Sequence, residues 1–331
     1  MTTPATAAPA HEAVRPDLIR YFPIPLFAST MGLSGLALVW LKVAHLWGWP
    51  ALIGQALTVL ATILFFLYLV LFVLKTIRHR HGVVEDWRHP IRLNFFAAIT
   101  ISLLLLGTAY RSFAPGFGHL LWLAGAIGHG LLVPLIIHTW IHHTHYQPTH
   151  INPAWFVPVV GNVVVPLAGV GYGHLEASWY FFAIGIVFWL VLLTIVMNRL
   201  IFFEPLPQRL APTLFILLAP PSVAMVAWLQ LNGEVLDGSA RILFSVALFL
   251  ALVLATNAAR FLKTPFFLSA WAYSFPLAAL TVATLTYAHL TGQQWTKGLG
   301  FSLVVLTTVV VFWLAVKTAI AAHKRVIFLP E

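Results

Sequence analysis

Long uninterrupted apolar stretches constrain this chain more than any other feature. In residues 53-74 (IGQALTVLATILFFLYLVLFVL), apolar side chains would cover the whole circumference of a helix. A helix of about 20 such residues spans a bilayer, and only 8% of the residues are charged, whereas soluble domains have about a quarter. A transmembrane barrel would instead alternate apolar and polar residues in segments of about ten. The pattern therefore predicts an all-α polytopic membrane protein.

Apolar runs bounded by charge, proline or glycine predict ten spans within a single transmembrane domain, residues 23-320. We expect residues 1-22 and 321-331 to form cytoplasmic segments on either side of this domain. The predicted spans cover residues 23-45, 50-75, 93-111, 118-141, 154-172, 178-199, 210-231, 240-262, 267-290 and 297-320.

The 18 Lys and Arg residues divide unequally between the two sides of this topology. With the N-terminus inside, 14 lie on one side and only Lys42, Arg111, Arg241 and Lys297 lie on the other. Because cytoplasmic loops collect Lys and Arg, we expect a multi-pass protein of the inner (plasma) membrane with both termini cytoplasmic. Orientation thus accounts for the net charge of +9, and nucleic acid is not an expected partner. We expect residues 78-92 to form a solvated loop at the lipid headgroups.

The spacing of the spans indicates an internal repeat. Odd-numbered spans begin near residues 23, 93, 154, 210 and 267, so successive helical hairpins start 70, 61, 56 and 57 residues apart. Lipid penalises backbone groups that proline leaves unpaired, so the proline-rich odd spans are expected to form an inner ring and the even spans an outer ring. The alternative is that proline is simply common in membrane helices. The prolines inside odd spans are Pro158, Pro166, Pro212, Pro220, Pro221 and Pro276, whereas Pro134 alone lies inside an even span.

The side chains available within the spans favour an anion as the permeant species. All nine acidic residues lie in termini or loops, whereas cation pathways and proton relays place carboxylates inside the membrane. The chain has no cysteine and no GxxxxGK[ST] phosphate loop, so thiolate chemistry and ATP-driven pumping are not expected. Small, hydroxyl and amide side chains suit an anion conduit, although such residues also mediate helix packing. The candidates for lining a pore or kinking its helices are Gly32, Gly35, Thr100, Asn162, Pro166, Thr213, Pro220, Ser274 and Pro276.

One histidine-rich segment, HTWIHHTHYQPTH (138-150), suggests a different function. On a helix, His138, His142 and His145 would share one face, and the spacing resembles one histidine box of membrane di-iron oxygenases. Such enzymes draw ligands from several boxes, and no second HxxHH occurs here. We therefore expect interfacial imidazoles, with no catalytic residue, metal or cofactor, and keep a membrane metalloenzyme as a remote alternative.

Four segments together resemble the tellurite-resistance/slow-anion-channel family of the TehA type. They are FPIPLFASTMGLSGLALVW (22-40), HPIRLNFFAAITISLLLLG (89-107), NPAWFVPVVGNVVVPLAG (152-169) and WAYSFPLAALTVA (271-283). The family includes plant guard-cell anion channels and is related to malate permeases and sulfite efflux proteins. The resemblance implies five hairpins with quasi-fivefold symmetry, a pore formed by the odd helices in each protomer, and a homotrimer.

The resemblance also implies a gate. In the family, a phenylalanine on the ninth helix plugs the pore, and the matching residue is Phe275, directly before Pro276. The resulting hypothesis is a gated channel that passes small monovalent anions such as chloride and nitrate. The alternative is a secondary transporter or exporter of four-carbon dicarboxylates, sulfite or tellurium oxyanions. A dicarboxylate carrier should need convergent donors or a basic residue at mid-membrane, and no Lys or Arg lies centrally in an odd span, which favours the channel.

Overall fold

The computed structural model describes residues 17–142 and 146–328, and throughout these ranges the regular elements are helical. Ten of the described helical segments are long and apolar enough to cross a membrane. They are Ile24–Trp47, Leu52–Arg78, Arg92–Tyr110, Pro115–His142, Pro153–Tyr172, Leu175–Phe202, Gln208–Leu231, Gly238–Ala255, Leu268–Thr291 and Gln294–His323. The predicted all-α polytopic fold with ten spans is confirmed.

Odd and even spans differ in both local structure and burial. Each even span is one continuous α-helix, and 22% to 39% of its most apolar window is buried, whereas the same share is 72% to 78% in the odd spans. The odd spans therefore form the interior of the bundle, and the even spans leave their apolar surfaces exposed, as lipid contact requires. The even helices are α2 (Leu52–Arg78), α5 (Pro115–His142), α8 (Leu175–Phe202), α10 (Gly238–Ala255) and α13 (Gln294–His323).

Every odd span opens with a 3-10 segment before it becomes α-helical. These segments are η1 (Ile24–Leu26), η2 (Arg92–Phe96), η4 (Pro153–Trp155), η7 (Gln208–Leu218) and η8 (Leu268–Tyr273). The α-helices that follow them are α1 (Phe27–Trp47), α4 (Ala97–Tyr110), α6 (Phe156–Val160), α9 (Ala219–Leu231) and α12 (Ser274–Thr291). This shared beginning supports the five-hairpin repeat, while fivefold symmetry stays a prediction.

Proline sets where several of these transitions occur. Pro220 lies in the first turn of α9 and Pro276 in the first turn of α12, where a missing N–H breaks no intrahelical bond. The fifth span is the most broken, because η5 (Gly161–Val164), α7 (Pro166–Gly169) and η6 (Val170–Tyr172) follow α6.

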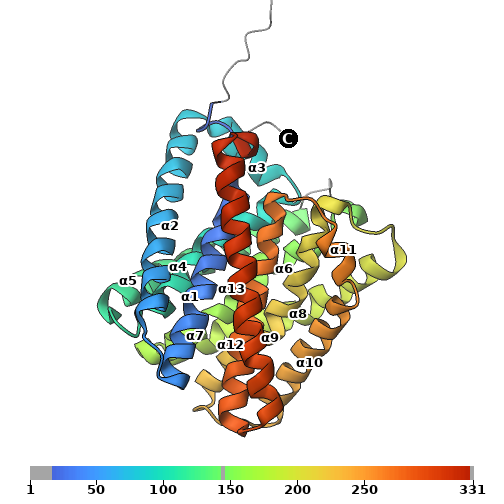
Figure 1. Ribbon diagram of the computed structural model, residues 1–331. Coiled ribbons are helices and arrows are strands. Elements are labelled where there is room, and N and C mark those ends of the chain that lie inside the picture. The colour runs from blue at the N-terminus through green and yellow to red at the C-terminus, as the bar shows by residue number, and fades with distance from the viewer. Residues whose placement is uncertain (1–16, 143–145, 329–331) are drawn as a thin grey trace, which may run out of the picture.

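Both described ends of the chain lie at the same end of the bundle (Figure 1), as an even number of spans requires. We call this end the terminal face and the other the opposite face. Two short helices lie in connections on the terminal face: α3 (Arg80–Arg88) and α11 (Ala258–Leu262).

Two expectations about the connections were wrong. Residues 78-92 are not simply a solvated loop, because they include helix α3, in which Asp86 is buried. The eighth span does not run to residue 262, because α10 ends at Ala255 and α11 is a separate helix. Thr256 and Asn257 cause this end by directing their side chains to the Val253 carbonyl oxygen, at 2.7 and 3.2 Å.

Close helix packing within the second hairpin gives the first prediction. A Cβ atom on Gly107 of α4 would lie 2.8 Å from both the carbonyl oxygen of Gly118 and the Cβ of Trp122 on α5. We expect Gly107→Ala to force these helices apart and to lower the free energy of unfolding by about 1–3 kcal/mol. Thermal unfolding in detergent would measure it, with Gly116→Ala as the control because open space surrounds that position. Equal stability of the two variants would contradict the prediction.

Candidate functional site

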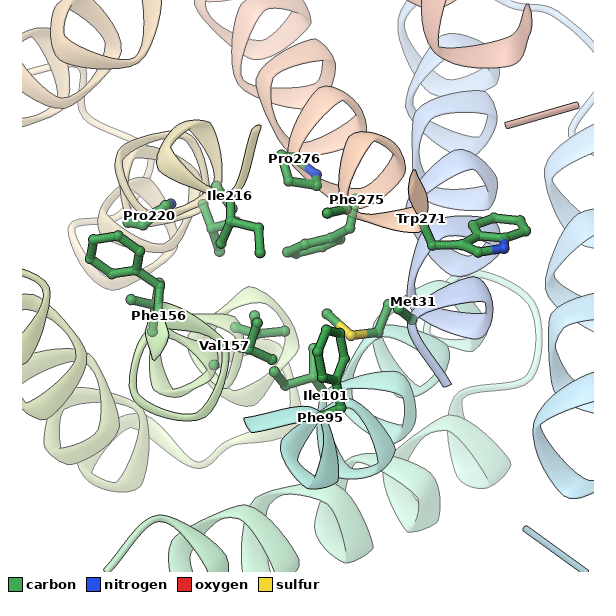
Figure 2. Close-up of a pocket in the computed structure, with 17 residues that line it drawn as sticks. Met31, Phe95, Ile101, Phe156, Val157, Ile216, Pro220, Trp271, Phe275 and Pro276 are labelled. Carbon is green, nitrogen blue, oxygen red and sulfur yellow. The ribbon is translucent and has the colours of Figure 1, made fainter. Parts of the chain in front are cut away.

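A small cavity lies at the centre of the bundle, and all five odd spans contribute to its wall. We call it the chamber; its volume is about 60 Å³. Figure 2 shows the Phe275 ring pointing into this space, with Met31, Ile216 and Val157 directed toward it from other spans. The full lining is Ala28, Met31, Phe95, Ile101, Phe156, Val157, Val160, Gly161, Val164, Ile216, Ala219, Pro220, Val223, Trp271, Ala272, Phe275 and Pro276.

None of the described residues that line the chamber has a charged side chain, and apolar side chains make up nearly all of the wall. An ion that enters must therefore lose hydration without gaining a fixed counter-charge from the lining. The energetic cost of that loss rises with the strength of hydration of the ion. Such a space tolerates a weakly hydrated ion better than a strongly hydrated one.

A second cavity, of about 40 Å³, lies further toward the opposite face and is also lined by all five odd spans. We call it the outer cavity. It shares Val223 and Phe275 with the chamber, so the Phe275 ring stands between the two spaces. Gly35 of α1 faces this ring: a Cβ there would lie 3.4 Å from Phe275 Cδ2 and 2.9 Å from Ala278 Cβ. Glycine therefore leaves room beside the ring.

A much larger cavity, of about 640 Å³, opens at the terminal face. This vestibule shares Phe95 with the chamber, so the three cavities follow one another along the interior. Its lining has many more basic side chains than acidic ones, and the acidic ones are Glu85 and Asp86. The basic residues are Arg20, Lys75, Arg78, Arg80, Arg92 and Arg209, together with three histidines, His79, His81 and His89.

A buried ion pair shapes this vestibule. Lys75 Nζ lies 2.6 Å from Asp86 Oδ2 and donates to the carbonyl oxygen of Phe22 at 2.9 Å, while Arg92 Nη1 lies 3.0 Å from Asp86 Oδ1. The side chains of Lys75 and Asp86 are only 5% and 3% exposed. A buried carboxylate needs such pairing to offset its lost hydration. Asp86 therefore ties α2, α3 and η2 together beneath the basic surface.

His89 adds a neutral side chain to the basic vestibule. Its Nδ1 accepts the backbone N–H groups of Ile91 and Arg92, at 3.1 and 3.2 Å. Burial, together with the nearby Arg92 and Arg209 guanidinium groups, lowers the pKa of His89 to about 4. At neutral pH the ring is therefore uncharged, and the positive charge of the vestibule resides on arginine and lysine.

The predicted site residues divide among these spaces. Phe275, Pro220 and Pro276 line the chamber, Gly35 lines the outer cavity and Thr213 lines the vestibule. Their functional roles stay predictions.

Five other candidates line none of these three cavities: Gly32, Thr100, Asn162, Pro166 and Ser274. Gly32 lies against Ser274, in the contact between α1 and α12. Thr100 Oγ1 lies 2.8 Å from His129 Nδ1 on α5, and Asn162 lines a separate cavity beside α5 and α8. Pro166 is buried at the start of α7.

Sequence reasoning missed Phe95 and Phe156, which line the chamber. It also missed the pair between Lys75 and Asp86. The available signal was a lysine at the end of a predicted span, Lys75, followed ten and eleven residues later by the acidic pair Glu85 and Asp86. Nothing in the sequence distinguishes the two phenylalanines from the other 23.

The described residues of the histidine-rich segment do not line the chamber. His138 and His142 stack at 4.2 Å between ring centroids near the end of α5, while His145 lies outside the described residues. Among the residues that the structure describes, no group of three His, Cys, Asp or Glu side chains is arranged to hold a metal ion.

Comparison with known proteins agrees with this architecture. The model of the family described as SLAC1, voltage-dependent anion channel, matches residues 21–319. The S-type anion channel SLAH3 of Arabidopsis thaliana is 33% identical, over 96% of this chain and 52% of its own length. The tellurite resistance protein TehA homolog of Haemophilus influenzae is 24% identical, over 82% of this chain and 84% of its own. The uncharacterized transporter MJ0576 of Methanocaldococcus jannaschii is 28% identical, over 81% and 84%.

Ten apolar spans arranged around an apolar chamber define an all-α multi-pass membrane protein. The family match covers nearly the whole chain: this chain belongs to the SLAC1 family. The resemblance to the tellurite-resistance/slow-anion-channel family is thereby confirmed. The chain spans about half the length of SLAH3.

The buried ion pair gives the second prediction. Asp86→Asn removes the only carboxylate that lies between Lys75 and Arg92 in the described ion pairs, and it leaves a buried ammonium group without a counter-charge. We expect the free energy of unfolding to fall by about 3–5 kcal/mol. Replacing both partners, Lys75→Met with Asp86→Leu, should recover much of the loss. Chemical denaturation in micelles measures each variant.

The control for this prediction is Glu85→Gln. Glu85 pairs with His81 at 3.0 Å, but these side chains are 61% and 89% exposed, so little stability depends on them. If Asp86→Asn were as stable as Glu85→Gln, Asp86 would not have the structural role assigned to it.

Proposed function

We propose that this protein is a gated anion channel that passes small monovalent anions, such as chloride and nitrate, passively through the chamber of each protomer, and that Phe275 closes the path at rest. The observation that carries the proposal is the position of the Phe275 ring between two cavities, each lined by all five odd spans. A ring there excludes a hydrated ion sterically and by dewetting. A change of its rotamer would join the two spaces.

The distribution of charge supports an anion as the permeant species. Basic side chains gather in the vestibule, while the chamber has none. A positive vestibule raises the local concentration of anions and rejects cations. An uncharged, apolar chamber then ranks the anions by the cost of dehydration, which favours weakly hydrated nitrate over chloride and disfavours divalent sulfate.

A transporter of dicarboxylates, sulfite or tellurium oxyanions is the second candidate. The names of two relatives, tellurite resistance protein TehA homolog and uncharacterized transporter MJ0576, favour it. A doubly charged substrate would have to shed much more hydration than a monovalent anion in a chamber of about 60 Å³ without a cationic side chain. This physical argument favours the monovalent channel.

We further propose that the terminal face is cytoplasmic, in the inner (plasma) membrane, and that three copies assemble through their even spans. The concentration of Arg and Lys around the vestibule supports this orientation. The exposed apolar faces of the even spans offer surfaces for lipid or for a second copy. Light scattering of the purified protein tests the trimer, and protease accessibility of the termini in sealed vesicles tests the orientation.

The gate gives the third prediction. Phe275→Ala removes the ring between the chamber and the outer cavity, and we expect nitrate flux in proteoliposomes to rise at least about tenfold, the effect of lowering a barrier by only about 1.4 kcal/mol. Phe275→Leu, which keeps a bulky apolar group, should stay nearly closed. Phe312→Ala is the control, because Phe312 is 70% exposed on α13.

The outcomes separate the two candidate functions. Strong monovalent anion current in Phe275→Ala with little malate, sulfite or tellurite uptake supports the channel. Saturable uptake of those substrates by the wild-type chain, unchanged in Phe275→Ala, would overturn both the channel and the gate.

The vestibule gives the fourth prediction. Arg209→Gln removes one positive charge from its lining. We expect the current carried by Phe275→Ala to fall about two- to fivefold at low ionic strength and to recover near 1 M salt, where the Debye length is about 3 Å. Lys263→Gln, on the same face but outside the vestibule lining, serves as the control. A loss that does not depend on salt would exclude electrostatic recruitment.

A further inference from the structure

A histidine is fully buried among the membrane spans. His129 of α5 is 0% exposed, and its Nδ1 lies 2.8 Å from the hydroxyl oxygen of Thr100 on α4. The Thr100 hydroxyl also lies 3.0 Å from the carbonyl oxygen of Ala97 and donates to it. The other ring nitrogen, Nε2, has no hydrogen-bond partner among the described residues. Buried polar atoms without partners are rare and invite an explanation.

The free nitrogen lies directly behind the chamber wall. A Cβ atom on Gly161 would stand 2.7 Å from His129 Nε2 and 2.7 Å from Ile101 Cδ1, which real side chains do not tolerate. Gly161 and Ile101 both line the chamber. The imidazole therefore fills the space that glycine leaves at the start of η5, with one layer of chain between the ring and the ion path.

Among the residues that the structure describes, no fixed charge faces this ring from the elements packed around it. Helices α4, α6, α7 and η5 contain no acidic or basic residue. The titratable groups of the other neighbours lie toward helix ends, and the Pro158 carbonyl is the polar group beside the ring. Those groups are Glu176, Tyr180 and Arg199 on α8, His119, His138 and His142 on α5 itself, Tyr110 at the end of α4 and Tyr172 in η6.

We propose that His129 is a proton-binding site coupled to anion occupancy of the chamber, an inference that rests on the proposed channel function. A proton taken from water in the pore adds to Nε2, the ring becomes an imidazolium ion, and the new N–H turns toward the Pro158 carbonyl. The charged ring has no carboxylate beside it, so the counter-charge that stabilises it is a permeant anion in the chamber. Acidification thereby strengthens anion entry.

The coupling is reciprocal. If protonation of His129 raises anion affinity by some factor, anion binding must raise proton affinity by the same factor. A unit charge several ångströms from the ion at an effective dielectric constant of about 20 changes anion occupancy by about tenfold or more. The pH at which the channel activates must therefore move upward as the permeant anion becomes more concentrated.

The test uses nitrate flux through the Phe275→Ala chain in proteoliposomes from about pH 8 to about pH 4.5, a range in which imidazoles titrate. We expect flux to rise about tenfold toward low pH, with a midpoint that shifts upward when nitrate is raised. His129→Phe, which keeps an aromatic ring of similar size, should abolish the rise. His129→Gln, which can keep a contact to Thr100, should abolish it too. His119→Phe, near the start of the same helix, should leave it intact.

A rise retained in His129→Phe, or a midpoint unmoved by nitrate, would overturn the inference. A readout that needs no transport separates it from the proposed function. Calorimetric titration of the purified wild-type chain with nitrate, in buffers of different ionisation enthalpy, should show proton uptake that is lost in His129→Phe. If Phe275→Ala passes no anion at any pH, the channel fails, while this proton uptake still decides the role of His129.

Discussion

Inside a lipid bilayer, each backbone N–H and C=O group needs a hydrogen-bond partner within the protein, and this structure depends on that constraint. The fifth span shows how the constraint is met where proline breaks a helix. Pro166 cannot donate to the carbonyl of Asn162, which accepts the N–H of Val165 at 3.2 Å instead. Trp122 of α5 donates to the Val165 carbonyl at 2.9 Å, and the Asn162 side chain donates to Val159 at 2.7 Å. Such partners exist only inside the protein, so the broken spans occupy the interior.

Burying the broken spans also accounts for the cavities inside the bundle. Inner helices that change from 3-10 to α geometry do not pack as one continuous surface, and the chamber and outer cavity lie where their small and apolar side chains meet. The basic side chains lie in the vestibule, where water and the buried Asp86 balance their charge. In the proposed channel, attraction of an anion and its dehydration therefore take place in different parts of the molecule.

The sequence predicted the spans well because the hydrophobicity of each segment reflects whether lipid or water surrounds it. Length and all-round apolarity identify a membrane helix, and proline placement distinguishes inner from outer spans. It predicted pore-lining residues less well, since an inner helix is buried on all sides and its pattern does not mark the face toward the path. Gly32 and Ser274 have the small and polar character of pore residues, yet they pack against each other between α1 and α12. Phe95 has no distinguishing character, yet it lies between the vestibule and the chamber.

The sequence by itself determined the fold class, the ten spans, the division into inner and outer helices and the family. These follow from local hydrophobicity, from proline chemistry and from motifs read in order along the chain. Only the tertiary structure decided that Phe275 lies between two cavities, that Lys75 and Asp86 form a buried pair, and that His129 stands behind Gly161. The physical reason is that each of these facts depends on the relative rotation and depth of helices distant in sequence, which close packing fixes and local pattern does not encode.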